Sequence, residues 1–269
     1  MRGIPRKFVL GLTAMALATA CASRAAAPSP MALHQSPPGT DSKRAILVEL
    51  FTAEGCSSCP PADDLLRAID GKTTNEGAVI VGVSEHVTYW DHDGWKDPYD
   101  ADAITDRQNE YERQFHVDSA YTPQMVVNGE TQVVGSDGKA LLQAIQKAGT
   151  ESGPTVNIVS AKLDGDAMDA VVSFAGNLPK HGADVYAVIA QDETTEHVLR
   201  GENKGRTLAH ASVARVLVKA AKIHEAGQSS VHVALPTGLS ATAGTRRHLI
   251  IWVQEPDAGH VLGVDTKTF

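Results

Sequence analysis

The sequence predicts an α/β domain with a helical insertion, followed by a mostly antiparallel β domain. Two apolar, β-branched runs, residues 44–51 and 78–84, flank a helical pattern over residues 60–70, as in a strand–helix–strand unit. Beyond Gly153-Pro154 the chain changes to alternating or β-branched runs separated by turn residues, which is typical of antiparallel sheets. With 269 residues the chain is long enough for two modest domains.

The first residues predict an export signal. A basic start precedes an apolar run over residues 8–20, which is too short to span a membrane and ends in small residues. We therefore expect a signal peptide over residues 1–20 and a periplasmic or secreted protein. Cys21 follows a small residue, as at the site where bacterial lipoproteins are cleaved and acylated, so two outcomes stay open. Either Cys21 carries a lipid anchor on a membrane surface, or the chain undergoes ordinary cleavage.

Between the signal and the first strand, residues 21–42 are rich in Pro, Ser and Ala and predict a disordered tether. The predicted organisation is a signal peptide (1–20), this tether (21–42), an α/β domain (43–153) and a β-rich domain (154–269). The formal net charge is -8 and no basic stripe is present, so we expect no nucleic-acid partner.

The remaining elements follow in chain order. Residues 102–115 predict the helix of the insertion. The runs QMVV and TQVV flank Asn128-Gly129, which is a strong hairpin signal. Residues 137–149 predict a closing helix, with Asp137 able to cap its start. Residues 207–223 fit either a strand or a helix.

Cys56 and Cys59 are the two cysteines of the mature fold, so they cannot belong to a larger disulfide framework. They lie where the first predicted strand leads into its helix. Unsatisfied N–H groups at a helix N-terminus favour a thiolate, so Cys56 is expected to be the nucleophile. Cys59, about one turn further, is expected to attack a mixed disulfide formed on Cys56.

A second signal is Thr122-Pro123, directly before a predicted strand. An X-Pro bond can be cis, and a cis proline marks a fixed tight turn. Together with the cysteine pair and the element order, this dipeptide resembles the thioredoxin superfamily. The resemblance implies that the α/β domain is thioredoxin-like and that Pro123, with Thr122, positions extended substrate backbone against the cysteines.

Glu49 lies within the first apolar strand, an unusual place for an acid. The thioredoxin resemblance implies that it assists proton transfer at the second cysteine, and burial would then raise its pKa. A strand acid that faces solvent is the equally open alternative.

A narrower resemblance covers nearly the whole chain after the tether. It rests on the stretches VELFTAEGCSSCPPAD, HVTYWDHDGWKDPY, RQNEY, YTPQMVVNG, LRGENKGRTLAH and WVQEPDAGHVLG. These stretches are similar to secreted thioredoxin-like proteins catalogued as domain of unknown function 1223. The sequence departs from that pattern around Thr88 and Asp93. The resemblance implies a fold and export, but no substrate.

Aromatic residues follow the second strand. Tyr89, Trp90 and Trp95 either form one wall of the site, with Trp90 contacting substrate, or close the core over the insertion helix. In the later motif LRGENKGR, the polar side chains of Glu202, Asn203 and Arg206 either bind a ligand or brace a turn, and the brace is favoured.

The favoured function is an extracytoplasmic thiol–disulfide oxidoreductase. It needs no diffusible cofactor, because its electrons come from the thiols or disulfides of partner proteins, including a redox partner. One alternative is binding of Cu or Zn through the same cysteines, with ligands from His86, His92 or His116. The other is a non-catalytic binding protein with an inert disulfide.

Overall fold

The structure is a computed structural model that describes residues 44–151, 153–236, 239 and 246–269. The expected signal peptide, the tether and Cys21 lie outside these residues. Among the described residues, no helix has both the length and the apolar character needed to cross a membrane.

The elements predicted for the first part of the chain are confirmed. They are β1 (Ala45–Thr52), α1 (Pro60–Ile69), β2 (Val79–His86), α2 (Asp102–Phe115), β3 (Gln124–Val127), β4 (Thr131–Val134) and α3 (Gly138–Gly149). Helix α1 begins with two prolines, which a first turn tolerates because its N–H groups have no partner within the helix. Helix α3 is capped by the Asp137 carboxylate, which accepts a hydrogen bond from the Ala140 N–H.

The second part of the chain is built of strands. They are β5 (Thr155–Asp164), β6 (Ala167–Ala175), β7 (Ala183–His197), β8 (Thr207–Ile223), β9 (Gly227–Ala234), β10 (Arg247–Gln254) and β11 (Val261–Thr268). The ambiguous segment 207–223 is thus one long strand, β8, which pairs with β7 along most of its length. Tertiary pairing decided between the two interpretations that its composition allowed.

The predicted fold class, an α/β thioredoxin-like domain followed by a separate antiparallel β domain, is wrong. Strands from both parts of the chain form one eight-stranded mixed sheet, in the order β11-β10-β7-β8-β2-β1-β3-β4. The two parts meet where β2 runs parallel to β8, with Ser84 opposite Val213. A smaller sheet, β5-β6-β9, is the remaining β structure in the described part of the chain, which is a mostly β protein.

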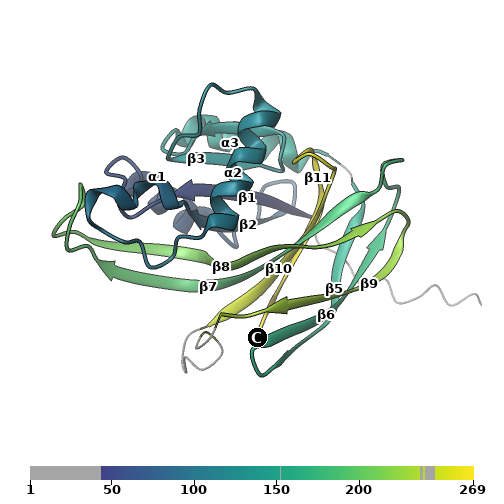
Figure 1. The fold of residues 1–269 in the computed structure, drawn as a ribbon. Coiled ribbons are helices and arrows are strands. Elements are labelled where there is room, and N and C mark those ends of the chain that lie inside the picture. The colour runs from purple at the N-terminus through teal and green to yellow at the C-terminus, as the bar shows by residue number, and fades with distance from the viewer. Residues whose placement is uncertain (1–43, 152, 237–238, 240–245) are drawn as a thin grey trace, which may run out of the picture. The chain divides into compact units, whose positions relative to one another are not determined.

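Three clusters of buried hydrophobic side chains pack against the large sheet. Figure 1 shows the helices and the smaller sheet beside it as ribbons. Helices α1 and α3 cover the face of β1 that carries Ile46, Val48 and Leu50. Helix α2 covers the opposite face, where Leu47 and Phe51 join aromatic residues from β7 and β10 in one core. The smaller sheet packs on β7 and β10. The core beneath α2 therefore contains residues from both parts of the chain.

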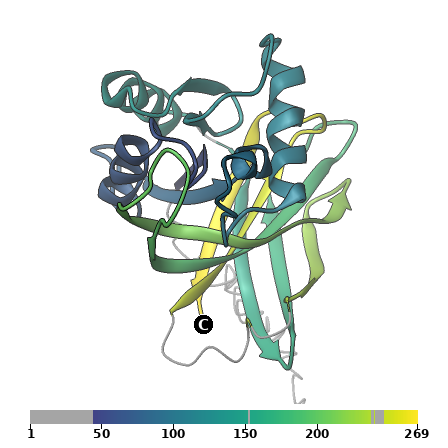
Figure 2. The ribbon, with the colours of Figure 1, turned by 60° about the vertical axis from the view of Figure 1, so that its left-hand side comes forward.

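The β7–β8 hairpin brings a distant segment to the start of α1. Its connection, residues 198–206, is called the β7–β8 loop below. Figures 1 and 2 both show the tip of this hairpin beside α1. This placement brings the LRGENKGR motif against the cysteine-bearing turn.

Candidate functional site

Cys56 and Cys59 form a disulfide in the turn between β1 and α1. The Cys59 N–H donates to the Cys56 carbonyl at 3.2 Å, and the Cys59 carbonyl in turn accepts the N–H groups of Ala62 and Asp63. Cys59 is therefore the N-cap of α1, and the disulfide lies at the positive end of that helix. Both cysteines are 0% exposed, so the sulfurs are covered in this form.

The structure brings Trp90, Thr122 and Pro123 to this turn. The Trp90 indole N–H donates to the Thr122 hydroxyl at 2.7 Å. The backbone of Trp90 lies so close to Gly55 that a Cβ there would be 3.0 Å from its carbonyl oxygen. The Thr122–Pro123 bond is cis.

Gly135 places Pro123 beside α1. A Cβ on Gly135 would lie 3.0 Å from both the Ala62 and the Pro123 side chains, so this glycine separates the proline from the first turn of the helix. The predicted substrate-positioning residues and the cysteine turn thus share one region of the molecule.

The β7–β8 loop closes over the turn. The Ser57 N–H and hydroxyl both donate to one carboxylate oxygen of Glu202, at 3.2 and 2.6 Å. The buried Asn203 carboxamide donates to the carbonyls of Glu54 and Cys56, at 2.8 and 2.9 Å, and Arg206 donates to its oxygen. The predicted brace is confirmed, and what it braces is the cysteine-bearing turn.

Glu49 is buried, but its partners are on α2. One carboxylate oxygen pairs with Arg107 and the other accepts the Tyr111 hydroxyl at 2.6 Å. The Arg107 guanidinium also donates to Gln254 of β10 and lies over the rings of Tyr111, Tyr186 and Trp252, which ties α2 to the large sheet. The role of Glu49 as a proton relay stays a prediction, and the solvent-facing alternative is wrong because the side chain is 0% exposed.

A second buried ionic group lies directly against the cysteine turn. His210 of β8 has its two ring nitrogens 3.3 Å from an Asp63 oxygen and 3.7 Å from a Glu54 oxygen. All three side chains are buried. Burial alone would lower the pKa of His210, but the two carboxylates reverse that effect and raise its pKa to about 9.

His86 and Asp97 extend this group. His86 Nδ1 lies 2.7 Å from an Asp97 oxygen, and the same oxygen accepts the Glu54 N–H at 2.8 Å. Burial would raise the pKa of Asp97, but His86 and the backbone donors hold it below its ordinary value. The His86 and His210 rings meet edge to face with centroids 4.7 Å apart. We call Glu54, Asp63, His86, Asp97 and His210 the buried ionic cluster.

Two of the histidines considered as metal ligands have other partners. His86 belongs to the buried ionic cluster, and His92 Nδ1 lies 2.8 Å from the Tyr89 carbonyl. His116 ends α2 with a left-handed backbone conformation. Among the described residues, the group with ligand atoms within 4.8 Å of one another is Glu130, Glu151 and His260.

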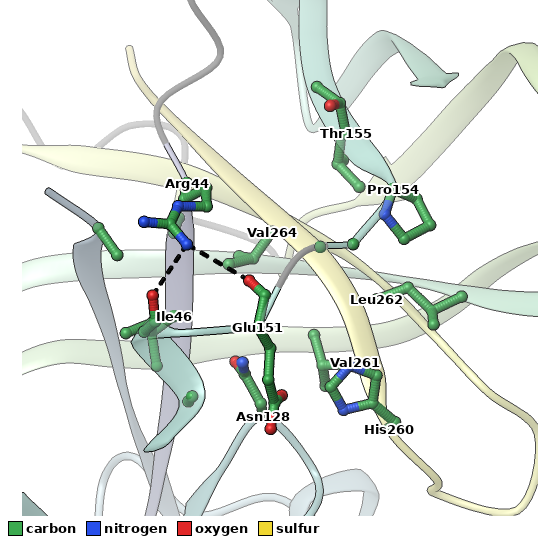
Figure 3. A pocket seen from close by; sticks show the side chains of 17 residues that line it. Arg44, Ile46, Asn128, Glu151, Pro154, Thr155, His260, Val261, Leu262 and Val264 are labelled. Atoms are coloured by element: carbon green, nitrogen blue, oxygen red, sulfur yellow. Dashed lines mark hydrogen bonds between the residues drawn. The ribbon is translucent and has the colours of Figure 1, made fainter. Parts of the chain in front are cut away.

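That group lies at the other end of β1 from the cysteines. Glu151 and His260 line a cavity of about 80 Å³ together with Ala45 and Ile46, the first residues of β1 (Figure 3). An eight-residue strand spans roughly 25 Å. The two features are therefore separate, and the carboxylates and imidazole by themselves do not make a cation site.

Sequence reasoning missed the buried ionic cluster. Glu54, Asp63, Asp97 and His210 were not among the predicted site residues. One signal was present: in the alternation of residues 207–223, His210 occupies a position in phase with the buried Leu208. A histidine at a buried strand position needs a partner, but the pattern does not name it.

Comparisons with known proteins give one family match and a few structural neighbours. A family model described as "Protein of unknown function (DUF1223)" matches residues 47–254. A structural-genomics target protein from Agrobacterium tumefaciens is 27% identical, with 82% of this chain and 92% of that chain covered and a TM-score of 0.59. A DUF3823 family protein from Bacteroides ovatus is 12% identical over 43% of this chain and 53% of that chain, with a TM-score of 0.25. A search of curated proteins found no match.

Proposed function

The chain belongs to the DUF1223 family of proteins of unknown function, and we propose that it is a thiol–disulfide oxidoreductase that acts outside the cytosol. The observation that carries the proposal is the Cys56–Cys59 disulfide at the N-terminus of α1, with Trp90, Thr122 and Pro123 gathered beside it. A helix N-terminus favours a thiolate, and a sulfur one turn away is within reach of a mixed disulfide.

The proposed reaction needs only sulfur atoms and protons. In the reduced form the Cys56 thiolate attacks a disulfide of a partner protein, which forms a mixed disulfide and releases one partner thiolate that takes up a proton. Cys59 then loses its proton and bonds to the Cys56 sulfur, and the second partner sulfur leaves. Two electrons pass to the partner protein, and the reverse reaction uses the same atoms with a partner dithiol.

Burial of both sulfurs sets a condition on this chemistry. A partner cannot reach a side chain that is 0% exposed, so we propose that the β7–β8 loop, which is bonded to the turn, moves before Cys56 reacts. The bonds that hold the loop are hydrogen bonds to the turn itself, from Ser57 to Glu202 and from Asn203 to the Cys56 carbonyl. The same burial favours the second candidate, an inert structural disulfide in a binding protein.

We also propose a relation between the cysteine site and the thioredoxin superfamily. It is supported by local features: a cysteine pair before a helix and a cis Thr-Pro before a strand. It does not extend to the overall fold, in which β8 joins β2. Pro123 is proposed to position substrate backbone, and Trp90 is proposed to hold Thr122 in place.

The location and partners are proposed from the expected signal peptide and from the chemistry. The partners are proteins with exchangeable thiols or disulfides, including one that returns the pair to its starting redox state. If Cys21 is acylated, the protein is tethered to a membrane surface.

Trapping tests the proposal. Cys59→Ala, expressed in its own host, should accumulate mixed disulfides on Cys56 that non-reducing electrophoresis separates. The matched control is the variant with both Cys56→Ala and Cys59→Ala, which keeps Cys21 and so removes any contribution from that thiol. If the single variant yields no species beyond those of the control, the oxidoreductase proposal fails. A reduction potential below about -300 mV for the wild-type pair would then favour the inert bridge.

A further inference from the structure

Several polar side-chain atoms of the buried ionic cluster have no hydrogen-bond partner among the described residues. His210 is held at ion-pair distance from Asp63 and Glu54, yet neither of its ring nitrogens makes a well-aligned hydrogen bond among the described residues. One oxygen of each carboxylate is likewise without a hydrogen bond. Buried polar atoms are normally paired, and exceptions are frequent at sites that move protons.

Asp63 connects this cluster to Cys59. The two residues are four apart, and the Asp63 N–H donates to the Cys59 carbonyl at 3.2 Å. Side chains at this spacing lie on one face of a helix, with Cβ atoms roughly 5–6 Å apart. Both residues are buried, and the Asp63 carboxylate is the acid on this face of the first turn of α1.

Glu54 connects the cluster to the other cysteine. It lies two residues before Cys56, and its carbonyl shares the Asn203 carboxamide with the Cys56 carbonyl. Its carboxylate accepts the Trp95 indole N–H at 2.7 Å on the oxygen that does not face His210. His210, which is more than 150 residues away in the sequence, thus lies between the two ends of the cysteine turn.

Several other groups face His210 or its neighbours. Their charges contribute to any titration of the cluster. On β2, His86 meets the His210 ring, and Asp97 holds His86. The Tyr99 ring lies 6.1 Å from that of His210, and Arg215 of β8 lies over Tyr99. Glu196 of β7 also acts electrostatically on Tyr99.

We infer that His210 is a positioning residue of the cysteine site: its positive charge holds the Asp63 carboxylate, which accepts the proton of Cys59, and favours the Cys59 thiolate. This inference rests on the proposed function. In the resolving step the Cys59 thiol gives its proton to the Asp63 carboxylate, and the Cys59 sulfur bonds to Cys56. The bond between Cys56 and the partner sulfur breaks, and the leaving partner thiolate takes up a proton.

Linkage makes the inference measurable without a partner protein. If a charged His210 favours the Cys59 thiolate, then thiolate formation must favour charged His210 by the same factor. The test uses the mature chain with Cys21→Ser and Cys56→Ser, so that Cys59 is the single thiol, and follows thiolate formation by ultraviolet absorbance against pH.

His210→Gln should raise the pH at which half of Cys59 is thiolate by about 1 unit or more, because a positive neighbour is lost. The control is His232→Gln, which removes an exposed histidine that also lies 2.7 Å from an aspartate, Asp169. The control should leave the midpoint in place. If His210→Gln leaves it in place as well, the inference is wrong.

A second measurement covers the case in which His210→Gln does not fold. The imidazole titration of His210 is followed by NMR in the single-thiol chain and in the same chain with Cys59→Ser. The midpoint should be higher where the thiolate can form, and identical midpoints would overturn the inference. Neither measurement needs catalysis. A trapping experiment that finds no partners would therefore contradict the proposed function, while the coupling between His210 and Cys59 is tested separately.

Discussion

The Asn203 side chain donates a hydrogen bond of 2.9 Å to the carbonyl of Cys56, which lies 147 residues earlier in the chain. The same carboxamide donates to the Glu54 carbonyl, and its oxygen accepts from Arg206. A buried amide with all of these partners fixes the β7–β8 loop on the turn that carries the disulfide. We therefore expect access to the sulfurs to depend on a loop that belongs to a different part of the sequence.

Asn203→Ala should speed reduction of the disulfide by a small phosphine. The change removes two hydrogen bonds to the cysteine turn, each worth about 1 kcal/mol, so the closed loop loses roughly 2 kcal/mol and opens about tenfold more often or more. The rate is measured by alkylation of the released thiols. Lys204→Ala, an exposed neighbour on the same loop, is the control and should reduce at the wild-type rate. Equal rates for all three proteins would show that the loop does not limit access.

The local elements were predictable because their signals are local. The periodicity of residues 102–115 and the Asn128-Gly129 turn are fixed by neighbours within a few residues, and the structure contains both elements as expected. The pairing of β2 with β8 was not predictable, because alternation in a strand shows which residues are buried but not which strand lies alongside. The prediction of two separate domains was wrong because β2 and β8 pair in one sheet.

The candidate site likewise contains residues that the sequence predicts and residues that it does not. The cysteines and the Thr122-Pro123 dipeptide could be found because each is a contiguous motif. The ion pair of His210 with Asp63 joins residues that are 147 positions apart and becomes visible only when β8 is placed next to α1. No spacing rule in one sequence predicts such a contact.

The stability of the fold should fall as the pH rises from about 6.5 to about 9. The pKa of His210 is raised from 6.5 to about 9 in the folded protein, so its charge stabilises the fold fully below the lower value and this contribution is lost by the upper one. A shift of this size corresponds to roughly 3 kcal/mol. Urea denaturation across this range measures it. His210→Gln should flatten the dependence, whereas His232→Gln should retain it; a steep slope in His210→Gln would assign the effect to another group.

Gly129→Ala should destabilise the protein strongly. Gly129 has a positive φ of 68°, and a Cβ there would collide with the Gly259 carbonyl in the β10–β11 turn and lie 2.9 Å from the Gln254 amide. Both strain and overpacking apply, so a loss of about 2–4 kcal/mol is expected in thermal or urea unfolding. Gly165→Ala is the matched control, since it also has a positive φ but nothing within 4 Å of the added Cβ. Equal losses of stability in the two variants would show that the close contact with the β10–β11 turn does not add to the destabilisation.

Asp63→Asn and Glu49→Gln should separate the two candidate proton acceptors. Glu49 has both oxygens engaged by Arg107 and Tyr111, so Glu49→Gln removes half of a buried ion pair and should cost about 3–5 kcal/mol of stability. Glu49→Gln should change the rate of thiol–disulfide exchange only to the extent that this loss of stability does. Asp63 lies one helical turn from Cys59, so Asp63→Asn should slow the release of a mixed disulfide by about tenfold or more.

The measurement is the rate at which a preformed mixed disulfide of Cys56 with a small chromogenic thiol releases that thiol, followed from pH 5 to pH 9 in both variants. Asp64→Asn is the matched control, because Asp64 is the adjacent acid on α1 but is exposed and pairs with Arg67. A slowed release in Glu49→Gln with a wild-type rate in Asp63→Asn would return the relay to Glu49. The two variants are expected to differ because the two acids have different surroundings. The Asp63 N–H donates to the Cys59 carbonyl, whereas the Glu49 carboxylate pairs with Arg107 of α2.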